Sequence, residues 1–265
     1  MKIQHIISTM NRENFSFLEK LCLKADAVVV NQNCPEKEEE LSLSNGVFIK
    51  AISTPEKGLS KSRNKLVENA TGDICIIGDD DVEYLDGYLD IIEHAYEKYP
   101  DADIIVFRFT NEKGKETRAR YTQDVAVTMQ NVSKFASVEI TFKLESIKKA
   151  GICFNNNIGL GTAFPSGEEN AFLADAVRAG LKIYHVPQTI CVAEEAFKVT
   201  DSYDVFKYLE DKGASFHCIY KNTFPLYALA FIVLKKKTIF KEVSIIKAFS
   251  LMCKGKKKYI KSTKE

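Results

Sequence analysis

The stretch "NATGDICIIGDDDVEYLDGYLD", Asn69 to Asp90, decides the fold class because a short apolar run in it ends in consecutive carboxylates. The run Ile74-Cys75-Ile76-Ile77 is typical of a buried strand. Neighbouring carboxylates repel one another and raise one another's pKa unless a cation lies among them. We therefore predict that a divalent cation binds at the end of this strand, near Asp79, Asp80 and Asp81.

A structural explanation competes with this prediction. One of the aspartates could end the strand and cap the N-terminus of the following helix, which is expected to begin near Glu83. A single cap needs a single carboxylate, so capping does not explain all three.

Apolar runs and helical patterns alternate on both sides of this stretch. We expect strands over residues 2–9, 26–32, 46–53, 74–78 and 102–109, helices over 14–25, 58–70 and 84–99, and a loop over 35–41. The second helix would have Ser60 as N-cap and Gly72 as a C-cap glycine. This alternation predicts an α/β fold whose central sheet is mostly parallel, with helices on both faces. Ligands of such sheets bind beyond the carboxyl ends of the strands, where Ser8, Thr9, Asn31 and the aspartates fall.

The composition limits the class of protein. The chain has 265 residues and a formal net charge of +1, so its overall charge does not indicate nucleic-acid binding. Its seven cysteines show neither CxxC spacing nor histidines at metal-ligand spacing, which argues against a disulfide framework and against a zinc site. The N-terminus fits neither a signal peptide nor a membrane span, so we expect a cytoplasmic protein.

Several motifs together resemble family-two glycosyltransferases. The segment "KGLSKSRNKLVENATGDICIIGDDDVEY" is similar to that family's Gly-Leu-Ser-x-x-Arg-Asn helix, Ala-x-Gly-Asp turn and Asp-x-Asp motif. The segments "IISTMNR" and "GEEN" stand where the family has its first nucleotide-contacting loop and its catalytic acidic pair. The resemblance covers roughly the first two hundred residues.

The resemblance implies a Rossmann-like GT-A domain over residues 1–200, followed by a helical, basic C-terminal extension over 201–265. Residues 1–110 would bind the nucleotide sugar and residues 111–200 the acceptor. The implied reaction moves a sugar from a nucleoside-diphosphate sugar to a glycan or lipid-linked oligosaccharide, as in bacterial polysaccharide biosynthesis.

The family pattern also assigns roles to the aspartates. It implies that Asp81 contacts Mn²⁺ or Mg²⁺, with Asp79 nearer the ribose and able to share the metal, and with Asp80 on the nucleotide sugar. Arg63, on the helix before this strand, could reach the diphosphate as a permanently charged planar donor. The alternative is that Arg63 is an ordinary surface charge on its helix.

Polar residues at the ends of the first two strands are candidates for base and ribose contacts: Ser8, Thr9, Arg12, Asn31 and Gln32. Many family members carry an acidic residue after the second strand, where this chain has "NQN". Uracil recognition would then depend on the amide of Asn31 instead of a carboxylate.

The second half of the reaction needs a general base. Glu168 and Glu169 lie in the first turn of an expected helix, where the helix dipole alone would favour carboxylates. They also match the family's acidic pair, whose second member removes the proton from the acceptor hydroxyl. The resemblance therefore implies that Glu169 is the base, with Glu168 as the second choice, in a direct displacement with inversion.

The C-terminal sixty residues differ in kind. The apolar segment "FPLYALAFIVL" is too short to span a bilayer, and it runs into a lysine-rich tail. This pattern predicts an interfacial helix attracted to an anionic membrane surface, which would place the enzyme at the inner face of the cell membrane. An ordinary packed helix with a solvated lysine tail is the alternative.

Two other functions fit part of the sequence. A nucleotidyltransferase would also use aspartates and a divalent ion, but its glycine-rich phosphate loop is missing from "ISTMNR". A noncatalytic module that binds nucleotide sugars would leave Glu168 and Glu169 without a purpose.

Overall fold

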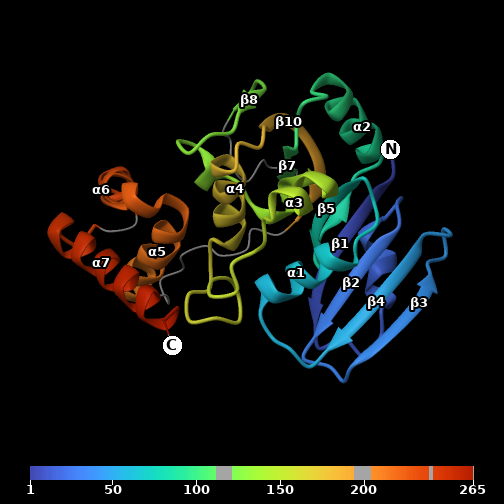
Figure 1. Ribbon diagram of the computed structural model, residues 1–265, viewed down its shortest axis with the longest axis horizontal. Helices are drawn as coiled ribbons and strands as arrows, with labels where there is room; N and C mark the ends of the chain where they lie inside the picture. Colours follow the sequence, from blue (N-terminus) through green and yellow to red (C-terminus); the bar gives the residue numbers. More distant parts are fainter. Residues whose placement is uncertain (112–120, 194–203, 239–240, 265) are drawn as a thin grey trace.

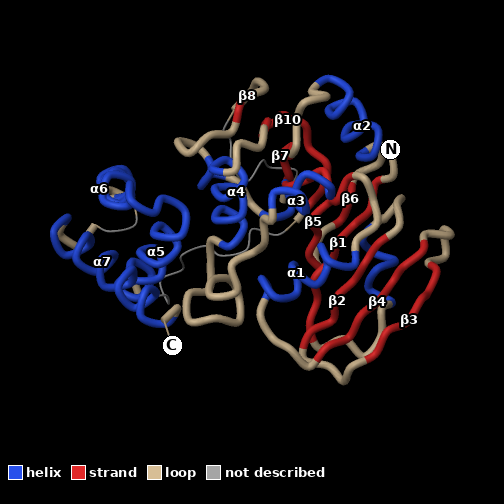
Figure 2. The backbone as a smooth tube through the Cα atoms, in the orientation of Figure 1, coloured by secondary structure: helices blue, strands red, loops and turns tan. Residues whose placement is uncertain are grey.

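The computed structural model describes residues 1–111, 121–193, 204–238 and 241–264. Within them, ten strands form one sheet in the order β3-β4-β2-β1-β5-β9-β7-β10-β6, with β8 paired to β10 (Figures 1 and 2). The strands are β1 (Ile3–Met10), β2 (Ala27–Gln32), β3 (Lys37–Ser42), β4 (Phe48–Thr54), β5 (Ile74–Asp79), β6 (Glu83–Tyr84), β7 (Ile104–Thr110), β8 (Val125–Ala126), β9 (Ile140–Lys143) and β10 (Ile183–Val192).

The predicted parallel sheet is present in strands β4, β2, β1 and β5. Their register pairs Thr9 with Asn31 and Ser8 with Asp79, so these polar residues meet at one edge. The rest of the sheet is mixed, because β9 lies antiparallel between β5 and β7. The fold is therefore the expected α/β class, with a parallel half that positions the residues following β1, β2 and β5.

Helices cover both faces of the sheet, as predicted. Leu66, Ile147 and Phe172 bury one face under α1 (Leu59–Asn69), α3 (Leu144–Ala150) and α4 (Glu168–Arg178). Leu18 and Ile92 bury the other under the 3₁₀ helix η1 (Ser16–Leu21) and α2 (Tyr88–Lys98). Two further 3₁₀ turns, η2 (Val132–Lys134) and η3 (Ser137–Glu139), precede β9.

For two segments the predicted type of secondary structure was wrong. Residues 37–42 form strand β3 at the edge of the sheet instead of a loop. Exposed Glu38 and Glu40 alternate with the half-buried Glu39 and Leu41, and charged side chains are tolerated on an edge strand because one side has no neighbour. The helix expected over 14–25 is only the six-residue η1, which ends where Cys22 adopts a left-handed conformation with φ of 56°.

Three predicted helix ends were also wrong. The N-cap of α1 is Gly58, and Ser60 lies inside the helix. The C-cap of α1 is Ala70, and Gly72 is instead needed because a Cβ there would approach the Cβ of Gln4 to 2.6 Å. Helix α2 begins at Tyr88 after Gly87, without a side-chain cap, so none of the three aspartates caps it.

The C-terminal extension is helical, as predicted, and consists of α5 (Val205–Tyr220), the 3₁₀ turn η4 (Lys221–Thr223), α6 (Phe224–Lys235) and α7 (Ile245–Ser262). One buried cluster continues from α4 through Leu209 of α5 to Met252 of α7. The expected domain boundary between residues 200 and 201 lies outside the described residues.

Candidate functional site

Arg63 joins the two acidic motifs that are far apart in the sequence. It is 1% exposed on α1, its Nη1 donates to Glu168 Oε1 at 2.9 Å, and its Nη2 donates to Asp79 Oδ1 at 3.2 Å. The ring of Phe154 lies 5.6 Å from its guanidinium carbon. The interpretation of Arg63 as a surface charge is therefore wrong, because the side chain is buried between the end of β5 and the start of α4.

Burial and the neighbouring carboxylates act on the pKa of Arg63 in opposite directions. Burial alone would lower the pKa of this guanidinium, but the carboxylates of Asp79 and Glu168 raise it. A buried cation that forms hydrogen bonds to two carboxylates fixes their positions, because breaking one pair would leave an uncompensated charge in the interior.

Glu169 differs electrostatically from its neighbour. Burial raises the pKa of Glu169 to about 7, and the negative charge of Glu168 adds to the effect. A carboxylate with a pKa near neutrality is suited to accept a proton, since it is partly ionised at working pH and basic enough to hold the proton it takes. Of the two glutamates, Glu169 is the one with a raised pKa, while Glu168 is bonded to Arg63.

The three aspartates after β5 have different surroundings. Asp79 also accepts a hydrogen bond from Ser137 Oγ at 3.2 Å. Asp80 accepts from Thr9 Oγ1 and forms an ion pair with Arg12 Nη2 at 2.8 Å. Asp81, the second residue of the turn after β5, is exposed.

This donor set fits a cation that is bound together with phosphates. In the part of the chain that the structure describes, no three His, Cys, Asp or Glu side chains converge as a metal-binding group. Mg²⁺ needs no such group, since one or two carboxylates and the substrate's phosphate oxygens commonly hold it. Exposed Asp81 and the partly exposed Asp79, two residues before it, could supply those carboxylates.

The predicted nucleotide contacts from β1 and β2 lie together beside the aspartates, but most of them are bonded within the protein. Asn31 accepts from Arg12 N at 3.1 Å and donates to Arg12 O at 2.8 Å. Gln32 accepts from Gly58 N at 2.8 Å, directly before α1. Ser8 contacts the Oγ of Ser62 at 3.0 Å. These residues hold the loops in place around the site, and direct contact between their side chains and a nucleotide stays a prediction.

Sequence reasoning missed residues that support the site. Ser137 lies in η3, and no motif indicates that it contacts Asp79. Asn170 donates to Phe135 O at 2.7 Å and so links α4 to the segment before Ser137. In the sequence, Asn170 is marked only as the last residue of the "GEEN" motif. The sequence patterns did not identify Gly159 either. Its φ of 107° favours glycine, and a hypothetical Cβ would lie 3.2 Å from Glu168 Cγ, closer than ordinary van der Waals contact.

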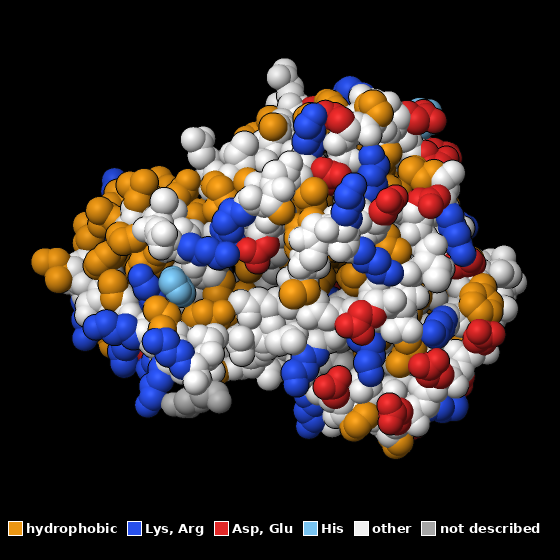
Figure 3. Space-filling model, viewed as in Figure 1, with side chains coloured by type: hydrophobic (Ala, Val, Ile, Leu, Met, Phe, Trp, Pro, Cys, Tyr) orange, Lys and Arg blue, Asp and Glu red, His pale blue; other side chains and the backbone are white. Residues whose placement is uncertain are grey.

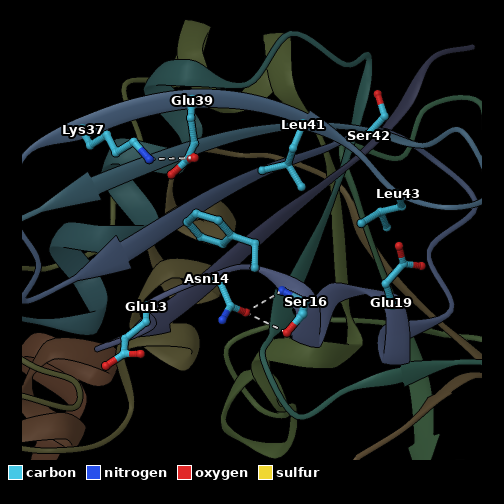
Figure 4. A pocket seen from close by; sticks show the side chains of 10 residues that line it. Glu13, Asn14, Ser16, Glu19, Lys37, Glu39, Leu41, Ser42 and Leu43 are labelled. Atoms are coloured by element: carbon cyan, nitrogen blue, oxygen red, sulfur yellow. Dashed lines mark hydrogen bonds and ion pairs between the residues drawn. The ribbon is translucent and has the colours of Figure 1, made fainter.

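A pocket of about 260 Å³ lies elsewhere, between η1 and β3 (Figure 4). Its lining includes Glu13, Glu19 and an ion pair between Lys37 and Glu39 at 2.8 Å. Helix η1 covers the face of the sheet opposite α1, which carries Arg63. The pocket is therefore separate from the carboxylate site.

Comparisons with known proteins agree with the geometry. The family model described as "Glycosyl transferase family 2" matches residues 26–157. Solved structures of TarS from S. aureus superpose with TM-scores of 0.60 and 0.61 at 15% and 14% identity, the second being a complex with UDP-GlcNAc. The matches cover 90% and 91% of this chain, and 44% and 74% of the respective TarS chains. Curated protein sequences give no match.

Proposed function

Because this chain belongs to glycosyl transferase family 2 and has the GT-A fold, we propose that it transfers a sugar from a nucleoside-diphosphate sugar to a hydroxyl group of a glycan or lipid-linked acceptor. The observation that carries the proposal is the pair of hydrogen bonds that Arg63 donates, one to Asp79 and one to Glu168. It brings the aspartate motif and the acidic pair into one site, as a reaction between donor and acceptor requires.

The donor would bind at the carboxyl ends of β1, β2 and β5. Asp81, with Asp79, would hold Mn²⁺ or Mg²⁺ there. When bound, such an ion stabilises the negative charge that develops on the departing diphosphate. The TarS structures support a uridine nucleotide as the first donor to test, since two of them contain UDP-GlcNAc and UDP.

The acceptor would bind on the side of Glu169. In our proposal Glu169 removes the proton of the acceptor hydroxyl while that oxygen attacks the anomeric carbon, so transfer occurs by one displacement with inversion. Glu168 and Arg63 position the start of α4, on which Glu169 lies.

Product analysis with radiolabelled nucleotide sugars tests this function. Release of nucleoside diphosphate together with a labelled glycan supports transfer. Pyrophosphate released from a nucleoside triphosphate and a sugar 1-phosphate, supplied in a parallel assay, would instead indicate a nucleotidyltransferase, and unchanged donor with measurable binding would indicate a noncatalytic module. Either of these two outcomes contradicts the proposal.

Asp81→Asn tests the role of the metal. We expect the substitution to abolish turnover and to remove the Mn²⁺ dependence of donor binding, measured by calorimetry with UDP-GlcNAc. The fold should persist, because Asp81 is exposed and one of three neighbouring negative charges disappears. Lys20→Gln, an exposed charge change in η1 on the opposite face of the sheet, is the control. Metal-dependent turnover at the wild-type rate in Asp81→Asn would disprove the assignment.

A further inference from the structure

Helix α6 has an apolar face that is turned to the solvent. Its exposed residues follow the spacing of one helical face: Leu226, Leu229, Ala230, Val233 and Leu234. Leu226 is 69% exposed and Leu234 is 78% exposed. The opposite face packs inward through Phe224, Ala228 and Ile232. Surface helices normally carry polar residues on the solvent side, so this face has the composition of a buried one.

The apolar surface continues onto neighbouring elements. Ile246, at the start of α7, is 84% exposed, and Ile245 is 40% exposed. Phe206 of α5 is 47% exposed, and Lys247 Nζ lies 5.8 Å from its ring centre. Figure 3 shows hydrophobic side chains gathered over α6 and the beginning of α7, at the left of the molecule.

Lysines lie at the C-terminal end of α6 and around the start of α7. Lys235, Lys236 and Lys237 follow the apolar face of α6 directly, and Lys241 and Lys247 precede and begin α7. From residue 221 to residue 264 the sequence contains a single acidic residue, Glu242. We call the exposed residues Leu226, Leu229, Val233, Leu234, Ile245 and Ile246, with these five lysines, the α6 surface.

We propose that the α6 surface binds an anionic lipid membrane, with the apolar face of α6 lying in the interface between headgroups and acyl chains. An apolar helix face bordered by lysines is the composition that lies in the plane of such an interface. None of the helices within the described residues is long and apolar enough to cross a membrane, so binding would be at the surface. The inference does not depend on the proposed sugar transfer.

A second copy of the chain fits the α6 surface less well. Helix α6 has twelve residues and is therefore about 18 Å long, so its exposed stripe covers on the order of 200 Å², whereas a stable dimer buries roughly 800 Å² on each partner. A two-fold contact would also place the lysines of one copy against those of the other. An anionic bilayer removes both difficulties, because it is extended and opposite in charge.

Two of the lysines near the end of the chain form ion pairs within the protein, so we place the membrane contact on the α6 surface instead of on the lysine-rich tail. Lys254 Nζ lies 2.6 Å from Glu210 Oε1, and Lys258 forms an ion pair with the same carboxylate. Although burial opposes the effect, the hydrogen bonds from these lysines lower the pKa of Glu210. The lysines of α7 therefore include two that hold α7 to α5, and removing residues 254–265 would disturb packing as well as charge.

Vesicle cosedimentation of the full chain tests the proposal. The apolar variant is Leu226→Gln/Leu229→Gln/Val233→Gln, and the charge variant is Lys235→Gln/Lys237→Gln/Lys247→Gln. Matched controls on the catalytic domain are Phe48→Gln, at a residue 40% exposed, and Lys20→Gln/Lys24→Gln/Lys57→Gln. The vesicles contain phosphatidylglycerol and phosphatidylcholine, or phosphatidylcholine alone.

We expect the wild type and both controls to bind the anionic vesicles, with binding that weakens as salt rises. The affinity of both α6-surface variants for the anionic vesicles should fall by about tenfold or more. Their thermal unfolding should not change, because the replaced side chains are exposed. Equal binding of wild type and apolar variant would overturn the proposal, as would absence of wild-type binding. A concentration-dependent dimer that only the apolar variant loses, without vesicle binding, would assign the surface to a second copy.

Discussion

Arg63 forms hydrogen bonds to two carboxylates from distant parts of the chain, so we expect its replacement to lower the stability of the fold strongly. In Arg63→Met, the carboxylate of Glu168, whose side chain is 7% exposed, would stay buried without its partner. We expect a loss of roughly 3–5 kcal/mol in the free energy of unfolding, measured with urea. Asp79 contributes less to this loss because its side chain is 30% exposed.

A second substitution separates the charge from the packing. Arg63→Met/Glu168→Gln removes the unpaired carboxylate, so it should recover part of the lost stability. With Glu168→Gln measured alone as well, the double-mutant cycle gives the coupling energy between the two side chains. If Arg63→Met unfolds at the wild-type urea concentration, the ion pair does not stabilise the fold.

Glu169 controls the pH dependence of the reaction in our proposal. Because its pKa is raised to about 7, the ionised form that accepts the proton should increase between pH 6 and pH 8, and kcat/KM should rise with it. Glu169→Gln should lower kcat by about 10²-fold to 10⁴-fold with donor binding nearly unchanged. If Glu168→Gln shows this behaviour and Glu169→Gln does not, the two roles are exchanged.

The same raised pKa predicts the sign of a stability change. Between the usual pKa of 4.5 and about 7, the folded chain holds the Glu169 proton more tightly than the unfolded chain does, so stability falls as pH rises through this window. Glu169→Gln removes the cost of ionising this carboxyl. We expect the variant to be more stable than wild type at pH 8 by about 1–3 kcal/mol, with little difference at pH 4. Equal melting temperatures at pH 8 would contradict a raised pKa for the partly buried Glu169.

At the scale of elements, the contact between α5 and α7 depends on two glycines. A Cβ at Gly255 of α7 would overlap the backbone of Glu210, and one at Gly213 of α5 would overlap the backbone of Met252. Helices approach this closely only where neither has a side chain in the contact. The glycines therefore set the distance between α5 and α7.

Gly255→Ala tests this packing. Within an unconstrained helix, alanine is more favourable than glycine by about 1 kcal/mol, so a loss of stability can only come from the overlap. We expect the melting temperature to fall by several degrees, with faster hydrogen exchange in α7. Lys257→Ala, an exposed position on the same helix, is the control and should change little. A melting temperature at or above that of the wild type would show that the helices separate without cost.

At the scale of the whole molecule, the C-terminal helices support the catalytic half. Ser215 of α5 donates to Ser166 O at 2.5 Å, and a Cβ on Gly167 would lie 2.9 Å from Ser215 Cβ. Gly167 directly precedes Glu168, so α5 packs against the turn that begins α4. Helix α5 thus helps to place the acidic pair.

We therefore expect that removal of residues 204–265 destabilises the rest of the chain. It would delete buried members of the shared cluster, such as Leu209 and Ala214, both 0% exposed, and uncover Phe164, whose ring lies 5.8 Å from that of Tyr259. We expect a truncated chain that lacks cooperative unfolding by circular dichroism and has no transferase activity. The full-length chain measured in parallel is the control. A soluble fragment with a sharp transition and wild-type kcat on a soluble acceptor would establish that residues 1–203 fold on their own.

The sequence by itself determined the fold class and the neighbourhood of the site. Apolar runs ending in polar residues identified β1, β2 and β5, since strand burial and parallel order follow from local pattern. The order of the motifs indicated the glycosyltransferase family before any contact was known. Elements at the edge, such as β3, escaped this reasoning because an exposed, charged strand has the composition of a loop.

Only the tertiary structure decided what each side chain does. The sequence placed Arg63 near the aspartates, but its burial between Asp79 and Glu168 depends on a contact across 105 residues of chain. It is likewise the packing of α4 that raises the pKa of Glu169 and the packing of α7 on α5 that pairs two tail lysines with Glu210. Local patterns report on propensity and on one face of an element, whereas ion pairing and burial depend on which distant residues arrive on that face.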